Sequence, residues 1–192
     1  MKSNKKHICW CIKQKKGIKL EEPNDNLCSV YIDKAKSALN MLNSAIEKDE
    51  TDWVATTAYY SRYFALYALL QKCGIKSEIH DCTISCMQYL FIEEEIIDEE
   101  LYKELCLAKD LRTDMQYYVT QELDKEKLKT DSETARNFVL KIEEVIENMT
   151  EEQIDSVREK LKECFEKKQI SKKGQWNKQI SKNEQNKQDS NS

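Results

Sequence analysis

The polar side chains best suited to chemistry stand together at residues 111–118, Leu-Arg-Thr-Asp-Met-Gln-Tyr-Tyr. Apolar residues on either side follow helical spacing, so Arg112 and Gln116, four residues apart, share one helix face. Tyr117 lies about 140° around the helix from Arg112, at ~100° per residue. An arginine between apolar positions is costly unless it is paired. Two interpretations follow: a salt bridge from Arg112 to an acid of the body, or an anion-binding arginine at a pocket or dimer seam, since guanidinium suits phosphate.

Other catalytic chemistry has little support in the sequence. The chain has two histidines, His7 and His80, and nothing pairs either of them with a cysteine as a nucleophile would require. Its three glycines are scattered, so no phosphate-binding loop can form. We therefore expect no cofactor.

The eight cysteines raise the question of a metal site. His7, Cys9 and Cys11 alternate along the N-terminal segment, while Cys82 and Cys86 are one helical turn apart. Zinc sites usually show a Cys-x-x-Cys pair, which is absent, so we expect no metal and mostly free thiols that pack as small hydrophobes. No signal peptide is recognisable and no apolar run approaches the ~20 residues of a membrane span. The expected location is a reducing cytoplasm, with no membrane contact.

Charge is divided unevenly along the chain, although the net charge is only −4. Residues 1–20 carry seven lysines and no acid, and residues 167–192 carry seven lysines against two acids. The body between them is strongly acidic, and it repels nucleic acid unless a local basic pocket or the basic ends overcome that charge. The ends can equally well be solvated runs that bind nothing.

The elements that must position these residues are helices, because glycine and proline are scarce and helix-forming residues are abundant. We expect an all-α, up-and-down bundle of four long helices and a shorter one, with an additional C-terminal helix. The second helix is apolar on nearly every side, so it should be central, and its tyrosines should be core residues rather than a base-stacking platform. The apolar periodicity and the capping residues predict helices over 27–48, 53–73, 80–94, 99–123, from Thr130, and from Thr150 to 168.

Several caps support these limits. Asn24 and its neighbours mark a helix entry, Thr51 and Asp52 are candidate caps of the second helix, and Gly74 is its expected stop. Thr130 and Thr150 each begin a capping-box pattern. The expected organisation is a basic, irregular arm (1–26), the bundle (27–149), an amphipathic helix (150–168) and a disordered basic tail (169–192) with a ten-residue duplication.

Three helices carry an ordered series of residues that resembles the HEPN domain (higher eukaryote and prokaryote nucleotide-binding). The fourth helix supplies Arg112 and Tyr117 at the positions of an "R-x-x-x-x-Y" element. His80 follows the second helix as in the small prokaryotic members, and the arm is similar to an extension of an archaeal subset. The remaining matches are Ala58, Tyr59, Tyr60, Tyr63, Ala65, Ala68, Leu69, Leu70, Gly74 and Ile75 in and after the second helix, and Ala135, Phe138 and Ile142 in the fifth.

The resemblance implies a helical bundle that often forms a homodimer. Many members are metal-independent ribonucleases in which an arginine is followed, after four to six residues, by a histidine. Many are toxins encoded beside a minimal nucleotidyltransferase, which can adenylylate a tyrosine near that motif. The position of that tyrosine corresponds to Val119 here, so that feature does not carry over.

The expected catalytic histidine is also missing, because Tyr117 stands in its place. Tyrosine, with an ordinary pKa near ~10, is a poor substitute for a group that titrates near neutrality. The leading hypothesis is a homodimer that binds a nucleotide, RNA or a nucleotidyltransferase through Arg112, Gln116, Tyr117, Tyr118 and His80. The alternatives are an active ribonuclease toxin that uses Arg112 with Asp114, Tyr117 or His80, and a structural module that docks a partner through its basic ends.

Overall fold

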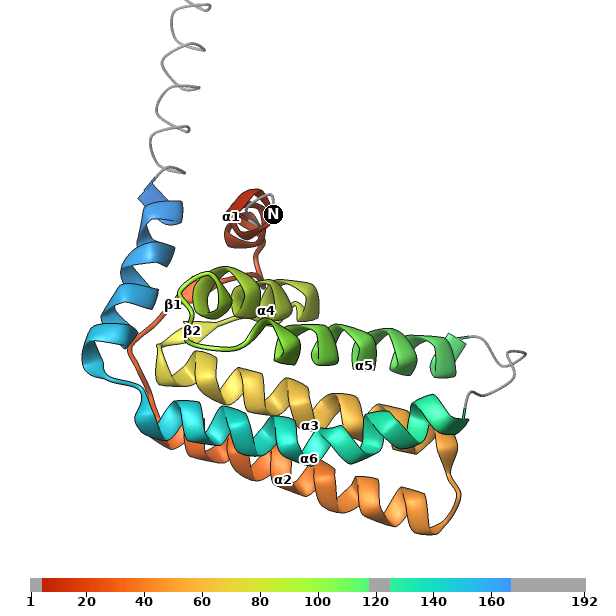
Figure 1. Ribbon diagram of the computed structural model, residues 1–192. Helices are drawn as coiled ribbons and strands as arrows, with labels where there is room; N and C mark the ends of the chain where they lie inside the picture. The colour runs from red at the N-terminus through yellow and green to blue at the C-terminus, as the bar shows by residue number, and fades with distance from the viewer. Residues whose placement is uncertain (1–4, 118–124, 167–192) are drawn as a thin grey trace, which may run out of the picture.

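The computed structural model describes residues 5–117 and 125–166, and it confirms the all-α bundle (Figure 1). Four long helices form the body: α2 (Asp25–Glu47), α3 (Thr51–Lys72), α5 (Glu99–Tyr117) and α6 (Lys125–Asn148). A shorter segment, α4 (His80–Cys86), continues as the π-helix η1 (Met87–Ile92). Residues 151–166 form the additional C-terminal helix. The predicted tail, 169–192, lies outside the described residues.

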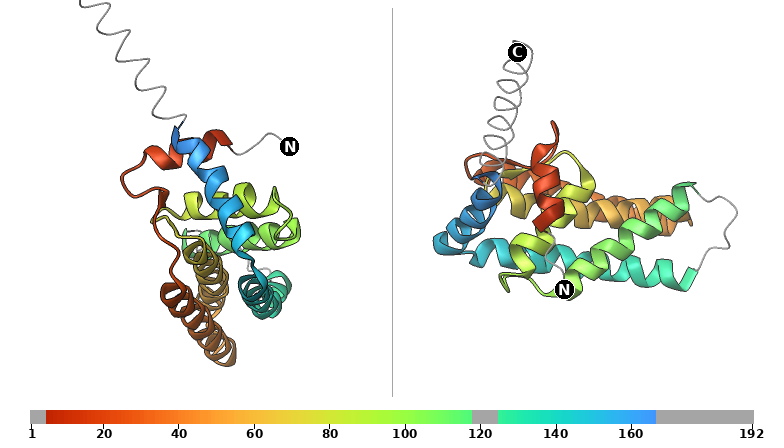
Figure 2. Two further views of the ribbon diagram at one scale, coloured as in Figure 1. Left: turned by 90° about the vertical axis from the view of Figure 1, so that its left-hand side faces the viewer. Right: turned by 90° about the horizontal axis from the view of Figure 1, so that it is seen from above.

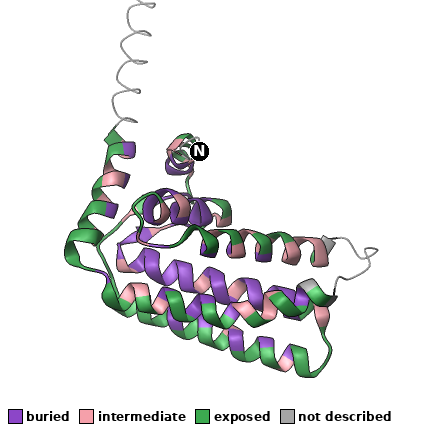
Figure 3. Cartoon of the chain, in the orientation of Figure 1, coloured by how far each residue is buried: buried purple, intermediate pink, exposed green. Residues whose placement is uncertain are grey.

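Helix α3 is the centre of the bundle, as its apolar composition predicts. Fifteen of its 22 residues are buried, so almost no face of the helix is left to solvent (Figure 3). It packs most extensively on α2 and also contacts α4, α5 and α6. Its alanines, including the fully buried Ala55, Ala58 and Ala65, allow these neighbours to approach closely.

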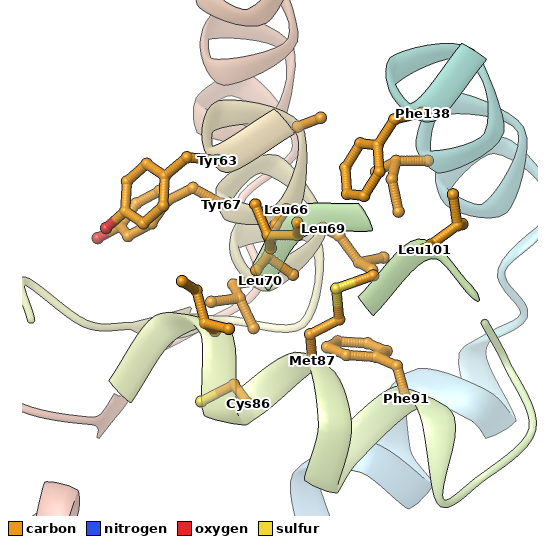
Figure 4. Close-up of a cluster of buried hydrophobic side chains, with 14 of the residues drawn as sticks. Tyr63, Leu66, Tyr67, Leu69, Leu70, Cys86, Met87, Phe91, Leu101 and Phe138 are labelled. Atoms are coloured by element: carbon orange, nitrogen blue, oxygen red, sulfur yellow. The ribbon is translucent and has the colours of Figure 1, made fainter. Parts of the chain in front are cut away.

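The C-terminal half of α3 packs against α4, η1, α5 and α6 in one apolar cluster (Figure 4). Leu66, Leu69 and Leu70 lie against Met87 and Phe91 of η1, with Phe138 of α6 on the other side. Tyr63 and Tyr67 point their hydroxyl groups away from these aliphatic side chains. The predicted buried stripe of the third helix, Ile84, Met87 and Phe91, is confirmed.

One buried charge lies within this apolar helix. The side chain of Arg62 is fully buried and pairs with the Asp131 carboxylate of α6 at 3.1 Å. It also donates hydrogen bonds to the carbonyl of Asp131, to the hydroxyl of Thr134 and to the carbonyl of Ala58. Burial lowers the pKa of Arg62, against the opposing effect of Asp131. This ion pair fixes α6 against α3.

The prediction of an irregular N-terminal arm is wrong, because the arm contains regular secondary structure. Residues Lys5–Lys13 form helix α1, and Lys19–Leu20 form strand β1, which pairs in antiparallel register with β2 (Ile75–Lys76). Helix α1 packs on α4, and Ile8, Cys11 and Ile12 are buried there. Nine residues are too few for a stable isolated helix, so α1 depends on contacts with α4 that lie far along the chain.

Cysteine pairing also differs in part from expectation. Six cysteines are free thiols, as expected for most of them. Cys11 and Cys82, however, are joined by a disulfide that links α1 to α4. The two residues are 71 positions apart, so no local spacing pattern indicates their pairing.

The helix limits mostly agree with the predicted caps. The Asn24 side chain accepts from the Leu27 backbone N–H at 2.9 Å, and Gly74 adopts a positive φ of 66° just after α3. Thr150 and Gln153 form the predicted reciprocal capping box. The predicted capping box at Thr130 is not formed. Helix α6 begins earlier, at Lys125, and the Thr130 hydroxyl donates to the Glu126 carbonyl inside the helix.

The caps proposed at Thr51 and Asp52 were also wrong. Glu50 occupies the N-cap position of α3 and makes no side-chain capping bond, while Thr51 and Asp52 lie inside the first turn. The predicted fourth helix is described only to Tyr117, and its remaining residues to 123 lie outside the described part of the chain.

The C-terminal helix, residues 151–166, lies across one end of the bundle (Figure 2). Arg158 donates to the carbonyls of Glu21 and Cys73, each at 2.8 Å, and so joins this helix to the segments around the two strands. Lys160 pairs with Glu93 and Glu94 beyond η1. In the described residues, no helix combines the length and apolar character needed to cross a bilayer.

Replacing Arg62 tests the packing of α6 on α3. Arg62→Met should lower the free energy of unfolding by roughly 3–5 kcal/mol, because it leaves Asp131 without its buried cationic partner. The exposed Arg136 of α6 provides the matched control, since Arg136→Met should change stability by less than about 0.5 kcal/mol. Urea denaturation followed by circular dichroism measures both. A loss below about 1 kcal/mol for Arg62→Met would contradict the role given to the ion pair.

Candidate functional site

Arg112 lies on α5 against the aromatic side chains of α3. Its guanidinium carbon is 5.4 Å from the ring centroid of Tyr59 and also 5.4 Å from that of Tyr60. The side chain is half-buried, and its Nε atom is shielded from solvent with no hydrogen-bond acceptor in the described residues. Contacts with two ring faces stabilise the cation by roughly 0.5–2 kcal/mol each but satisfy none of its N–H groups.

The salt bridge considered for Arg112 is not found in the described part of the chain. No acid of residues 5–117 or 125–166 forms an ion pair with its guanidinium, whereas the neighbouring basic residue Lys109 pairs with Asp81. Arg62, which the sequence did not single out, makes the buried arginine–carboxylate pair instead. A half-buried guanidinium without a carboxylate partner is the arrangement that leaves donors for an external anion.

His80, the first residue of α4, joins Arg112 at the same aromatic group. Its Nδ1 atom is 2.8 Å from the Tyr59 hydroxyl, and its ring stacks on Tyr63 with centroids 4.2 Å apart. Tyr60 meets the same imidazole edge-on at 6.1 Å. The structure therefore brings together two predicted site residues, Arg112 and His80, which are far apart in the sequence.

Burial is the largest cause of the pKa shifts of His80 and Tyr59. Burial, followed by the nearby positive charge of Arg112, lowers the pKa of His80, which favours the neutral imidazole. Burial also raises the pKa of Tyr59, which keeps the phenol protonated. The Tyr59 hydroxyl can therefore donate to Nδ1 of His80, an arrangement that leaves the ring proton on Nε2.

The expectation that the tyrosines of the second helix are core residues holds for Tyr59, Tyr63 and Tyr67, all of which are buried. Tyr60 is only half-buried and stacks on the half-buried Phe64, with centroids 5.6 Å apart. The ring centroid of Phe64 in turn lies 6.3 Å from that of Tyr31 in α2. An aromatic edge thus continues from Arg112 across α3 to α2.

The other predicted site residues do not join this group. Asp114 is half-buried and Gln116 is exposed, and in the described residues neither makes a hydrogen bond or ion pair with Arg112 or His80. Tyr117 is the last residue of α5, and Tyr118 lies outside the described residues. The roles predicted for these four side chains stay predictions.

A hollow of about 560 Å³ near the buried Arg62 is a poor alternative site for an anion. Its lining includes the acids Glu100, Glu104, Glu126 and Asp131. Burial, with the other nearby acids, raises the pKa of Glu104, while Arg62 opposes that shift. Carboxylates at this density repel phosphate, so Arg112 is the better anion-binding candidate.

A second group of chemically active side chains lies between α1 and α4. The ligand atoms of His7, Cys11 and Cys82 are all within 4.8 Å of one another. The sequence had drawn attention to His7 with Cys9 and Cys11, and separately to Cys82 with Cys86. It missed this grouping because the side chains come from two helices and only their packing brings them together.

The sequence carries a signal for Arg112 but not for the neighbours that surround it. Helical spacing placed Arg112 between apolar positions, and this was enough to select it. Its tyrosine neighbours were visible only as an apolar stripe, because their relation to Arg112 depends on how α5 packs against α3. His80 was selected by its place after the second helix in the HEPN resemblance, but no spacing related it to Arg112.

Comparison with known proteins agrees with the fold and with the resemblance in the sequence. No curated protein matches the chain. The model of the HEPN domain family matches residues 28–168, which include all but the first three residues of α2, the helices from α3 to α6 and the C-terminal helix. That match covers well over half of the 192 residues, so the chain belongs to the HEPN domain family.

Proposed function

We propose that the protein is a HEPN binding module that holds a phosphate group of a nucleotide or RNA at Arg112. The observation that carries the proposal is the half-buried guanidinium of Arg112, which lies over Tyr59 and Tyr60 and has no carboxylate partner in the described residues. A phosphate supplies the acceptors that these protein groups do not.

The surroundings of Arg112 strengthen its attraction for an anion. The rings of α3 exclude water from one side of the guanidinium, and a charge-assisted hydrogen bond is stronger where the local dielectric is low. Lys109, one helical turn earlier on α5, adds a second positive charge, although Asp81 neutralises part of it. The half-buried ring of Tyr60 offers an adjacent face for a base.

The acidic body sets the conditions of binding. It opposes the approach of a polyanion, so affinity should be modest and should fall as salt screens the few positive contacts. A mononucleotide suffers less of this repulsion than a long RNA. The basic segments at 1–20 and 167–192 supply the long-range attraction that the body lacks.

The same proposal includes the assembly expected from the family resemblance. The protein acts as a homodimer in the cytoplasm, within a toxin–antitoxin-like system whose second component is a minimal nucleotidyltransferase. In a dimer with two-fold symmetry, one surface patch meets its own copy. Residues near Arg112 that lie at such a seam would bring two anion sites together.

Arg112→Ala should weaken the binding of a fluorescently labelled single-stranded RNA by about 5- to 150-fold, the equivalent of ~1–3 kcal/mol for a bidentate arginine contact. Arg112→Lys should recover only part of this loss, because an ammonium group cannot reproduce the planar fork. Arg136→Ala, which removes an exposed arginine of α6, is the control and should bind as the parent does. Fluorescence anisotropy at fixed salt measures all three affinities.

Equal weakening by Arg112→Ala and Arg136→Ala would indicate attraction to overall positive charge. That result, or parent-like binding by Arg112→Ala, would remove the basis for a site at Arg112.

A second function is favoured by one specific observation, the position of His80. An imidazole that shares Tyr59 with Arg112 can take the place of the histidine that the fourth helix lacks. Arginine would stabilise charge on the phosphate while histidine transfers a proton, which is the division of labour in metal-independent RNA cleavage. The chain would then be a ribonuclease toxin with its histidine supplied by α4.

Incubation with mixed cellular RNA in the presence of a metal chelator separates the two functions. The binding-module proposal predicts no cleavage above that of a buffer blank. The ribonuclease alternative predicts cleavage that falls by about 10²- to 10⁴-fold in His80→Ala, the usual contribution of a general acid or base. It also predicts the loss of cleavage in Arg112→Ala, whereas Arg136→Ala should cleave as the parent does. Cleavage that persists in both site variants would exclude this site as its source.

A further inference from the structure

The contact between α1 and α4 contains three metal-binding side chains that take no part in the Arg112 site. His7 and Cys11 are one helical turn apart on α1, so both project from the same face. Cys82 lies in the first turn of α4, the helix against which that face packs. Two helices separated in the sequence by all of α2 and α3 thus supply one nitrogen and two sulfur atoms to one place.

Reduction of the disulfide, which now holds the two sulfur atoms together, would let these three atoms approach the spacing of a tetrahedral zinc site. Zinc bonds of about 2.0–2.1 Å to nitrogen and ~2.3 Å to sulfur place neighbouring ligand atoms roughly 3.3–3.8 Å apart. The ligand atoms of His7, Cys11 and Cys82 all lie within 4.8 Å of one another. Separation of the two sulfurs after reduction, with a shift of about 1 Å by the imidazole, would complete the geometry.

Burial makes this set selective for a soft divalent cation. Cys11 and Cys82 are both fully buried, so two thiolates at this place would be costly without a neutralising charge. One Zn²⁺ balances two thiolates, and a neutral imidazole adds no charge. Two thiolates with one imidazole are ligands typical of zinc, whereas magnesium and calcium prefer oxygen.

His7 is also held in a defined orientation and leaves access for solvent. Its ring stacks on Trp10 with centroids 5.5 Å apart, which limits its rotation. The same ring lines a hollow of about 460 Å³, together with Asp81, Tyr102 and Cys106. This hollow reaches His7 but neither Cys11 nor Cys82, and it is the nearest source of a water molecule for the fourth position of a three-ligand zinc site.

We propose that the reduced protein binds one Zn²⁺ through His7, Cys11 and Cys82, and that the Cys11–Cys82 disulfide is the metal-free, oxidised form of this site. Sulfur atoms that are bonded to each other have no thiolate to donate, so the two forms exclude each other. The proposal does not depend on what Arg112 binds.

The exchange balances with a small disulfide, such as oxidised glutathione, as the oxidant. One zinc-bound thiolate attacks the small disulfide, forms a mixed disulfide and releases one small thiolate. The second protein thiolate then attacks the protein sulfur of that mixed disulfide and releases the other small thiolate. Two electrons pass from the protein thiolates to the small disulfide, and Zn²⁺ leaves unchanged in charge.

In both forms the site fastens α1 to α4. The disulfide does so through a covalent bond between two cysteines that are 71 residues apart in the sequence, and zinc would do so through three coordinate bonds. Only the form that is reduced and free of metal lacks either link. Helix α1 should be least stable in that form.

The test uses the full chain, reduced under anaerobic conditions, freed of metal and titrated with Co²⁺ as a spectroscopic probe for Zn²⁺. One equivalent should bind and produce an intense thiolate-to-cobalt charge-transfer band, which an equivalent of Zn²⁺ should abolish. Protein oxidised with glutathione disulfide should produce no such band. Cys11→Ser and Cys82→Ser should each lose the high-affinity site, and His7→Ala should weaken it by about tenfold or more.

Cys9→Ser is the matched control, because it replaces a half-buried cysteine of the same helix that is outside the cluster. It should bind one equivalent as tightly as the parent, and circular dichroism should show that the helical bundle of α2, α3, α5 and α6 stays folded in every variant. The proposal is overturned if reduced protein binds no metal, if the band survives in Cys82→Ser, or if Cys9→Ser loses binding as Cys11→Ser does.

Discussion

The structure depends on the enclosure of helix α3 on almost every side. A buried polar side chain on such a helix has little access to water, so it needs a partner in its own helix or in an element packed against it. Arg62 therefore pairs with Asp131 of α6, Tyr59 with His80 of α4, and Tyr63 with Thr83 of the same short helix. These three connections orient the surrounding helices more specifically than apolar contacts alone.

The candidate site is a consequence of that enclosure. Tyr59 is buried and Tyr60 is half-buried, and Arg112 of α5 lies over the rings of both. Tyr59 also holds the imidazole of His80, so one buried phenol connects both predicted polar groups. Arg62 uses its guanidinium to hold helices together, whereas Arg112 has no carboxylate partner in the described residues. This contrast separates the structural arginine from the one available to a ligand.

Sequence patterns predicted the structural features that depend on the spacing of residues close together in the chain. The long helices, the central place of α3 and the capping box at Thr150 all follow from such patterns. The same capping pattern failed at Thr130, because burial of Leu128 extends α6 toward its N-terminus. Helix α1 could not be predicted from nine residues, since its apolar face is stabilised only by α4. The proximity of His80 to Arg112 could not be predicted either, because it results from the packing of both residues against Tyr59 of α3.

The most direct test of the account is the nuclear magnetic resonance signal of the Arg112 side-chain Nε–H group during addition of a mononucleotide. The chain has four arginines, so assignment needs only a few single variants. The account predicts that the Arg112 signal shifts in a saturable way while that of the ion-paired Arg62 stays in place. An unchanged Arg112 signal at saturating nucleotide, or equal shifts at Arg136 and Arg158, would contradict a phosphate site on α5.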